Sequence, residues 1–485
     1  RIPGVVIDGR QEYQYFGPWT WLAGSYPHPT STDEQPQSFR AFPDLHLDRV
    51  SADRQRFAAW WYRVENFCPP EILPGFITHQ TPRDDAKGVM RRDRFRARDW
   101  DYLGWKYSLI SSIATAPMNQ VINMIPARDV EEYDAFSAED QKWLKSWLDW
   151  TDHNRDILLN LRPILNQPMI GHVDGTAAIK GDHGFIFLFN PNYRAMEARF
   201  SLDASIGLTS GERFALRQLY PDAQKGRVMA VGRRGDLLSI PLHGTDALVL
   251  EVSPLPAEIH DPLLVGSAGT ANLHDSQLDL TDISGEPGTT LPLQVLVPNP
   301  ASVRKVKLNG LNVAFSRTNN SIQVTVRFEG KPFSQAQQIG TYDPTFAGGH
   351  FHGRISIPKR IFQQLRDRTR RWPINYSEDD LKATWLGPSR LLLFVNVADP
   401  TDKMHAQLRI DGQPVPLTKA YSSIYASAVE RTFVGWYADV SSLAPGQDHD
   451  FELTLPEMKK GRFQGLFFDN VEPEYASTVG RAMAQ

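Results

Sequence analysis

Three aspartates stand where a carboxylate could act as a nucleophile, an acid or a base. The first, Asp8, ends the short apolar run Gly4-Val5-Val6-Ile7 and is followed at once by Gly9-Arg10. A run of this kind predicts a buried parallel strand that presents Asp8 at its carboxyl end. The Asp-Gly pair equally suits the two-residue turn of a β-hairpin, so these residues alone leave both structures open.

The other two candidates, Asp99 and Asp101, lie in a charged stretch that leads into a predicted helix containing Trp105. From there either carboxyl could reach the sheet edge that carries Asp8 and donate a proton, with Asp101 as first choice and Asp99 as second. Both could instead cap that helix, where acidic residues favour the helix dipole. A structural network with neighbouring arginines is a further alternative.

Residues after the first two predicted strands have side chains suited to ligand contact. Indole rings offer a flat apolar face for stacking, and His, Gln and Arg offer hydrogen-bond donors. An arginine near Asp8 would also keep that carboxylate ionised. Single Trp and His residues are equally compatible with a structural role. The candidate ligand-binding residues are Arg10, Trp19, Trp21, His79, Gln80 and Arg83.

Short apolar runs alternate with helical patterns over residues 1–170. Such alternation indicates βα units and a parallel sheet, here the C-terminal half of a (β/α)8 catalytic barrel. Half a barrel cannot bury its inner face, so we expect the missing N-terminal half upstream of residue 1 or in a second chain. Predicted strands cover 4–8, 72–77 and 120–125, and predicted helices cover 48–64 (apolar at Val50, Phe57, Trp60, Trp61 and Val64), 105–113 (Trp105, Leu109, Ile110 and Ile113) and 137–150 (Trp143, Leu144, Trp147, Leu148 and Trp150).

From residue 171 the pattern changes to short strands separated by turn residues. Two strands flank a tight Gly181-Asp182-His183-Gly184 turn, and further runs follow to residue 252. We expect an antiparallel β-sandwich over 171–255. Beyond the stiff Pro254-Leu255-Pro256, residues 256–485 predict a jelly-roll-like β-sandwich with carbohydrate binding as one candidate role. This part includes one basic helix at 359–371 whose charges most simply face solvent.

Composition excludes several classes of function. The chain has 485 residues, 41% of them hydrophobic and 22% charged, with a net charge of -4, which gives no electrostatic case for nucleic acid or an anionic membrane. Its one cysteine, Cys68, excludes an internal disulfide and a cysteine-based zinc site. With no ligand spacing for a metal and no phosphate-binding loop, we expect no metal and no cofactor.

The ends of the chain and its surroundings are less constrained. No apolar run reaches the ~18 to 20 residues of a transmembrane helix. The chain has no initiator Met and no signal peptide, so we expect that these were removed or that the chain starts inside a longer protein. The compartment stays open, with a periplasmic or secreted one slightly favoured, and so does the oligomeric state, a homo-oligomer included.

Three motifs in order are similar to the second half of a known enzyme family. They are Val5–Gly9, Arg98–Asp101 leading a helix to Ser111–Pro117, and Gly184–Pro191 opening a sandwich. This order resembles the glycoside hydrolases of the α-galactosidase (melibiase) clan. The resemblance implies a (β/α)8 barrel followed by an antiparallel β-sandwich, with catalytic aspartates ending the fourth and sixth strands. The segment Gly465–Glu472 resembles the closing strand of galactose-binding-like jelly rolls.

The resemblance makes Asp8 the expected nucleophile and Asp101 or Asp99 the expected acid. The clan's usual Ser-Asp pair is replaced by Arg98-Asp99-Trp100-Asp101, which leaves the match of the second carboxylate open. Cleavage of a glycosidic bond needs two such carboxylates. We therefore expect a retaining, exo-acting glycosidase for an oligo- or polysaccharide with galactose-like or arabinose-like units. The alternative is a non-catalytic carbohydrate-binding or scaffolding protein on a degenerate barrel.

Overall fold

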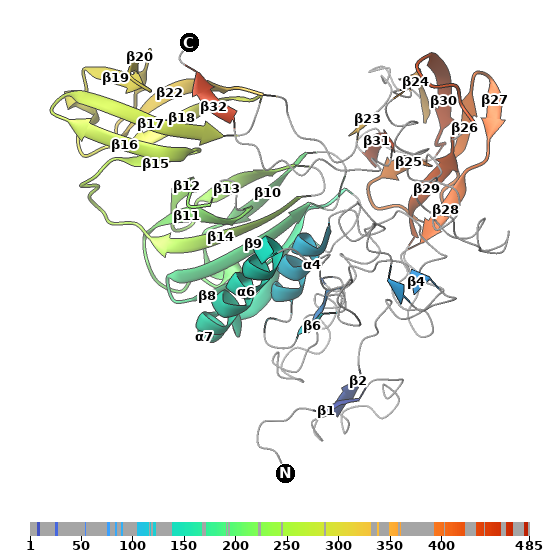
Figure 1. The fold of residues 1–485 in the computed structure, drawn as a ribbon, viewed down its shortest axis with the longest axis horizontal. Coiled ribbons are helices and arrows are strands. Elements are labelled where there is room, and N and C mark those ends of the chain that lie inside the picture. Colours follow the sequence, from blue (N-terminus) through green and yellow to red (C-terminus); the bar gives the residue numbers. More distant parts are fainter. Residues whose placement is uncertain are drawn as a thin grey trace.

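The computed structural model describes two long stretches of the chain and several short segments. The long stretches are 138–330 and 392–468, each with internal gaps. The short segments are 7–9, 25–27, 54, 75–77, 83–84, 89–90, 104–115, 117, 120–122, 337–338, 349–356, 359 and 480–483. Within these residues the protein is mostly β-sheet with few helices (Figure 1).

Near the N-terminus, short strands pair in parallel. Strand β1 (Ile7–Gly9) runs parallel to β2 (Ser25–Pro27), with Asp8 opposite Tyr26. Because Asp8 and Gly9 both belong to this strand, the hairpin-turn alternative for the Asp-Gly pair is wrong. Strands β3 (Gly75–Ile77) and β6 (Gln120–Ile122) also pair in parallel, whereas β4 (Arg83–Asp84) and β5 (Val89–Met90) are antiparallel. The described residues do not join these pairs into one sheet, so the half-barrel stays a prediction.

Two of the four predicted helices are confirmed. The first is α4 (Gly104–Ile113), which buries Leu109, Ile110 and Ile113, and the second is α6 (Ala138–His153), followed by the short α7 (Arg155–Leu158). On α6, Leu144 and Trp147 are buried, but Leu148 is 37% exposed, because it lies off the face that meets the sheet. The predicted helix 48–64 lies outside the described residues apart from Arg54, and the basic helix 359–371 apart from Lys359.

The antiparallel strands expected after residue 171 are present. The turn between β8 and β9 is the two residues Gly181-Asp182, and His183 already pairs with Lys180 across the hairpin. Gly181 has φ of +73°, as the first position of such a turn favours. The sheet runs in the order β7 (Leu161–Leu165), β8 (Asp174–Lys180), β9 (His183–Asn190), β14 (Asp246–Pro254), β11 (Arg213–Tyr220), β12 (Val228–Arg233).

Both faces of this sheet are covered, as Figure 1 shows. Phe185, Phe187 and Phe189 pack against α4, α6 and α7, while Ile186 and Leu188 face the opposite way. The opposite layer is the antiparallel pair β10 (Met196–Ser201) and β13 (Leu237–Leu242), with the short 3-10 helix η4 (Ala204–Ile206). This explains the unbroken apolar run of β9, because successive side chains of a strand point to opposite faces and here neither face meets water.

The same sheet continues through β15 (Leu263–Val265), which pairs in parallel with β12 at Val228 and Val265. The strands that follow bury their own core, which includes Leu280, Val295 and Val324. The last described strand, β32 (Gly480–Met483), joins this part between β17 (Gln277–Gly285) and β22 (Ser321–Phe328) (Figure 1, red). The other elements are β16 (Ala268–His274), β18 (Thr290–Leu296), η6 (Pro300–Ser302), β19 (Lys305–Leu308), β20 (Leu311–Asn312) and β21 (Ser316–Arg317).

Two further antiparallel sheets enclose a separate core that includes Val395, Trp436 and Phe451. One has the order β23 (Gln337–Gln338), β31 (Phe463–Phe468), β25 (Leu392–Val397), β29 (Phe433–Asp439), β28 (Thr418–Tyr421). The other has the order β24 (His350–Ser356), β30 (Asp448–Thr454), β26 (Gln407–Ile410), β27 (Gln413–Val415). Residues 256–485, expected as one domain, thus contain two separate buried clusters, and the jelly-roll connectivity stays a prediction. We call the unit formed by these two sheets the C-terminal sandwich.

The double-sided burial of β9 predicts unequal costs for two truncations. Phe187→Ala should lower the free energy of unfolding by about 3–5 kcal/mol, because it opens a cavity at a fully buried position. Leu237→Ala, at a side chain 68% exposed, should change it by less than about 0.5 kcal/mol. Denaturant titration followed by tryptophan fluorescence measures both, since Trp150 lies 6.4 Å from Phe187 between ring centroids. Equal effects would contradict this burial pattern.

Candidate functional site

The candidate catalytic residue that the structure describes is Asp8, through its backbone. It is the middle residue of β1 and lies opposite Tyr26 of the parallel strand β2. Parallel strands end at the same edge of a sheet, so the segments that follow β1 and β2 leave from one side. Arg83 lies in β4, opposite Met90. The remaining candidates lie outside the described residues: Arg10, Trp19, Trp21, His79, Gln80, Asp99 and Asp101.

The second parallel pair brings two further strand ends together. Ile77 of β3 lies opposite Ile122 of β6, so the segments beginning at residues 78 and 123 leave the same edge. The first of these segments contains the candidates His79 and Gln80. Helix α4 contacts β3. It also packs into the core between the helices and the sheet that contains β7, β8, β9, β14, β11 and β12, which we call the large sheet. These contacts tie the strand that precedes His79 to the rest of the fold.

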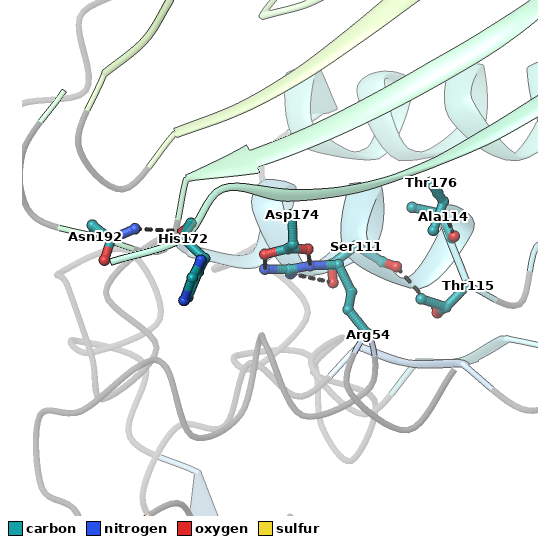
Figure 2. A network of polar contacts seen from close by, with 8 residues as sticks. All are labelled: Arg54, Ser111, Ala114, Thr115, His172, Asp174, Thr176 and Asn192. Atoms are coloured by element: carbon teal, nitrogen blue, oxygen red, sulfur yellow. Dashed lines mark hydrogen bonds and ion pairs between the residues drawn. The ribbon is translucent and has the colours of Figure 1, made fainter. Parts of the chain in front are cut away.

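Arg54 and Asp174 form a buried ion pair that was not predicted from the sequence (Figure 2). Arg54 Nε donates to Asp174 Oδ1 at 2.5 Å, and a terminal nitrogen donates to Asp174 Oδ2 at 3.1 Å. A second terminal nitrogen donates to Ser111 Oγ at 2.8 Å. The guanidinium also stacks over the Phe189 ring, 4.0 Å from its centroid. The pair therefore joins residue 54, helix α4 and strands β8 and β9.

Burial sets the electrostatics of this pair. Both side chains are 2% exposed. Removal from water raises the pKa of the Asp174 carboxyl, and the charge and hydrogen bonds of Arg54 oppose that rise. Two hydrogen bonds from Arg54 hold the carboxylate in place, and almost none of it is exposed to solvent. Such a group suits a structural role better than proton transfer to a substrate.

Two more contacts extend this network along β8 (Figure 2). Thr176 Oγ1 donates to the carbonyl of Ala114 at 2.7 Å, just beyond the end of α4. Thr115 Oγ1 donates to the carbonyl of Ser111 at 3.2 Å. Asp174 and Thr176 share the face of β8 that meets the helices. Thr176 bonds the end of α4 directly, and Asp174 is linked to Ser111 of α4 through Arg54. The helix end is thereby anchored to the sheet rather than left to solvent.

The tryptophans of α6 pack within the protein. Trp147 and Trp150 have ring centroids 5.2 Å apart, and Trp150 lies 4.6 Å from Phe185 in an edge-on arrangement. Trp143 and Trp147 both contact Tyr220. These edge-on contacts account for three of the twelve tryptophans as part of the helix–sheet core. These contacts place Trp147 in the buried core and Trp143 and Trp150, which are partly buried, against it.

A histidine–aspartate pair lies in the C-terminal sandwich. His449 Nδ1 lies 2.7 Å from Asp411 Oδ2, and its Nε2 lies 3.0 Å from the carbonyl oxygen of Ala444. With an acceptor at each ring nitrogen, the doubly protonated imidazolium is favoured. The hydrogen bond with Asp411 raises the pKa of His449, and the hydrogen bond with His449 lowers the pKa of Asp411. The charge of Asp448 also favours protonation of His449.

The described residues contain no group of three or more His, Cys, Asp or Glu side chains that could hold a metal ion. Among the same residues, no helix is both long enough and apolar enough to cross a membrane.

Sequence reasoning missed Arg54 and Asp174, although a signal for Arg54 was present. Val50, Arg54, Phe57, Trp61 and Val64 follow each other at spacings of four, three, four and three residues. Arg54 therefore occupies the apolar stripe of the predicted helix 48–64. A cation in such a position predicts burial with a partner. No comparable local signal marks Asp174.

Comparisons with known proteins complete the description. No family model matches the chain, and no curated protein matches it in sequence. Similar solved structures include a Bacillus halodurans protein provisionally called an α-N-acetylgalactosaminidase (12% identity, 48% of this chain and 49% of that chain, TM-score 0.29). Others are a β-L-arabinopyranosidase from Geobacillus stearothermophilus (14%, 48% and 50%, 0.28) and an α-amylase from Geobacillus thermoleovorans (14%, 44% and 46%, 0.28).

These names are those of glycoside hydrolases, and the chain spans about half the length of each structure. TM-scores below 0.5 and identities of 12–14% are too low to carry an argument about this chain.

The buried ion pair predicts a large loss of stability when one partner is removed. Arg54→Met should lower the free energy of unfolding by about 3–5 kcal/mol, because Asp174 would stay buried without a counter-charge. The double variant Arg54→Met/Asp174→Leu should recover much of that loss. Arg155→Ala, which breaks the exposed pair with Asp152, is the matched control and should cost about 1 kcal/mol or less. A single variant as mild as this control would contradict the interaction.

The His449–Asp411 pair predicts a pH-dependent stability. Because the pKa of His449 is raised on folding, its contribution is fully present below the unfolded value of 6.5 and is lost as pH rises through the folded value. The contribution of Asp411 is lost only at acid pH, as pH falls through its lowered pKa. The melting temperature of wild type minus that of His449→Gln, measured from about pH 5 to about pH 9, should therefore shrink toward the alkaline end. A difference independent of pH would contradict the pair.

Proposed function

We propose that this protein is a glycoside hydrolase that cleaves terminal bonds of an oligo- or polysaccharide with two carboxylates. The observation that carries the proposal is Asp8, placed within a strand that runs parallel to β2. In α/β barrels the catalytic residues come from the carboxyl ends of parallel strands. Asp8 is followed by one more strand residue, Gly9, so it lies next to that end.

In this proposal Asp8 attacks the anomeric carbon and Asp101 protonates the leaving oxygen. Asp99 is the second choice for the acid. Retention of configuration requires the two carboxyl groups to stand about 5–5.5 Å apart, with the acid later acting as base toward water. The two aspartates precede α4 in the sequence, and α4 contacts β3 of the second pair of parallel strands.

The remaining candidates would bind the sugar. Trp19 or Trp21 would stack on an apolar sugar face, and His79 and Gln80, just beyond β3, would donate hydrogen bonds to hydroxyl groups. Arg10 and Arg83 are the other two proposed sugar-binding residues. A neutral saccharide suits a chain with a net charge of -4 that has no basic surplus to attract an anionic ligand. We propose galactose-like or arabinose-like units as the substrate class.

A single substitution tests the proposal. Asp8→Asn should reduce kcat on a responsive nitrophenyl glycoside by about 10³-fold or more, as loss of a catalytic nucleophile does. The screen should include nitrophenyl α-galactosides and arabinosides. Circular dichroism and the melting temperature should stay at wild-type values, because the amide has the size of the carboxylate.

The matched control is Asp261→Asn, the same chemical change at an exposed aspartate in the connection before β15. It should keep wild-type activity. A folded Asp8→Asn protein with full turnover would disprove the role of Asp8. Saccharide binding without turnover by the wild-type protein would instead favour the non-catalytic alternative.

Replacing Asp8 with the smaller alanine distinguishes a nucleophilic role of Asp8 from a role as general base. In Asp8→Ala, added azide should restore turnover by entering the vacated space and attacking the anomeric carbon. The product should be a glycosyl azide with inverted configuration, which proton NMR identifies. Release of the inverted free sugar by the wild-type enzyme would instead show that a water molecule attacks directly, and the carboxyl groups would then be expected about 6.5–9.5 Å apart.

A further inference from the structure

We propose that the loop Gly171-His172 and the loop Ala398-Asp399 form a latch that holds the C-terminal sandwich against the large sheet. Gly171 and His172 lie one residue before β8, and Ala398 and Asp399 directly follow β25. Each loop is held rigid by its own part of the protein, and the two meet at one close contact. The latch is independent of the proposed glycosidase activity.

On the side of the large sheet, Asn192 holds the loop (Figure 2). Its Oδ1 accepts from the backbone N–H of Gly171 at 2.6 Å, and its Nδ2 donates to the carbonyl of His172 at 2.7 Å. Asn192 is itself 2% exposed. Its backbone N–H donates to Asn190 Oδ1 at 3.1 Å, and its Nδ2 donates to the same oxygen at 3.0 Å. A buried asparagine with these bonds fixes the direction of residues 171 and 172.

On the side of the C-terminal sandwich, Arg462 holds the other loop. Its Nε donates to the carbonyl of Ala398 at 3.0 Å, and a terminal nitrogen donates to the carbonyl of Asp399. The backbone N–H of Ala398 donates in return to the carbonyl of Arg462 at 2.7 Å. Three bonds to one residue therefore present Ala398 and Asp399 as a fixed surface.

The two loops fit together through a glycine. A Cβ added to Gly171 would lie 2.2 Å from the Cβ of Ala398 and 2.7 Å from its Cα, so no side chain fits at this position. Beside this contact, His172 Nε2 lies 2.5 Å from Asp399 Oδ1. His172 is 27% and Asp399 57% exposed. Solvent weakens such a polar contact, so the packing of Gly171 on Ala398 is the main constraint and the His–Asp pair adds orientation.

The test is a variant that obstructs the packing. Gly171→Ala should force the two loops apart, and small-angle X-ray scattering of the folded full-length chain should show a larger radius of gyration than wild type. Gly235→Ala is the matched control. Gly235 has φ of +89° against +88° for Gly171, but nothing lies within 4 Å of an added Cβ. The control therefore carries the same backbone strain without the collision, and its scattering should equal that of wild type.

Two results would overturn the latch. One is a folded Gly171→Ala protein with wild-type scattering, and the other is an equal expansion in Gly235→Ala. If Gly171→Ala does not fold, His172→Ala, Asp399→Ala and the double variant decide the question. The latch predicts that the double variant lowers the melting temperature by less than the sum of the single variants, and additive effects would refute it.

Discussion

Removing a guanidinium from water is tolerable only where a carboxylate and further acceptors take the place of the lost solvent, and Arg54 meets that condition at one place in the described fold. Its partner Asp174 stands 120 positions further along the chain, and Ser111 comes from α4 between them. All three segments must be assembled before the charge is satisfied. The pair therefore selects one arrangement of helix and sheet, since any other would leave a buried charge unpaired.

Apolar packing on the large sheet also selects one arrangement. Because β9 is buried on both faces, misplacing either the helix layer or the β10–β13 layer would expose the core on that face. Helix α4 belongs to this shared core and also contacts β3, whose carboxyl end precedes candidate sugar-binding residues. Any site at that edge is thus positioned by the sheet beneath it as well as by its own strands.

Local patterns were enough to predict elements whose neighbours are close in sequence. The stripe of α4 and the hairpin near Gly181-Asp182 follow from spacing over a few residues, whereas the residues around Asp8 left a strand and a turn equally open. Pairings between distant segments left no such trace, which is why Asp174 was missed and why residues 256–485 were expected to share one core. The choice between Asp99 and Asp101 depends on side-chain geometry that spacing does not contain.

Because β32 returns to pair with β17 and β22, the C-terminal sandwich is an insertion within the unit that contains those strands. Strands β17 and β22 are complete by residue 328, yet their partner β32 is formed by residues 480–483, after the whole C-terminal sandwich has been synthesised. During synthesis the C-terminal sandwich can fold while the ends of β17 and β22 that β32 later covers are still unpaired, and unpaired strand edges readily pair with the wrong chain. Of the two units, the earlier one in sequence is therefore the more exposed to misassembly on the ribosome.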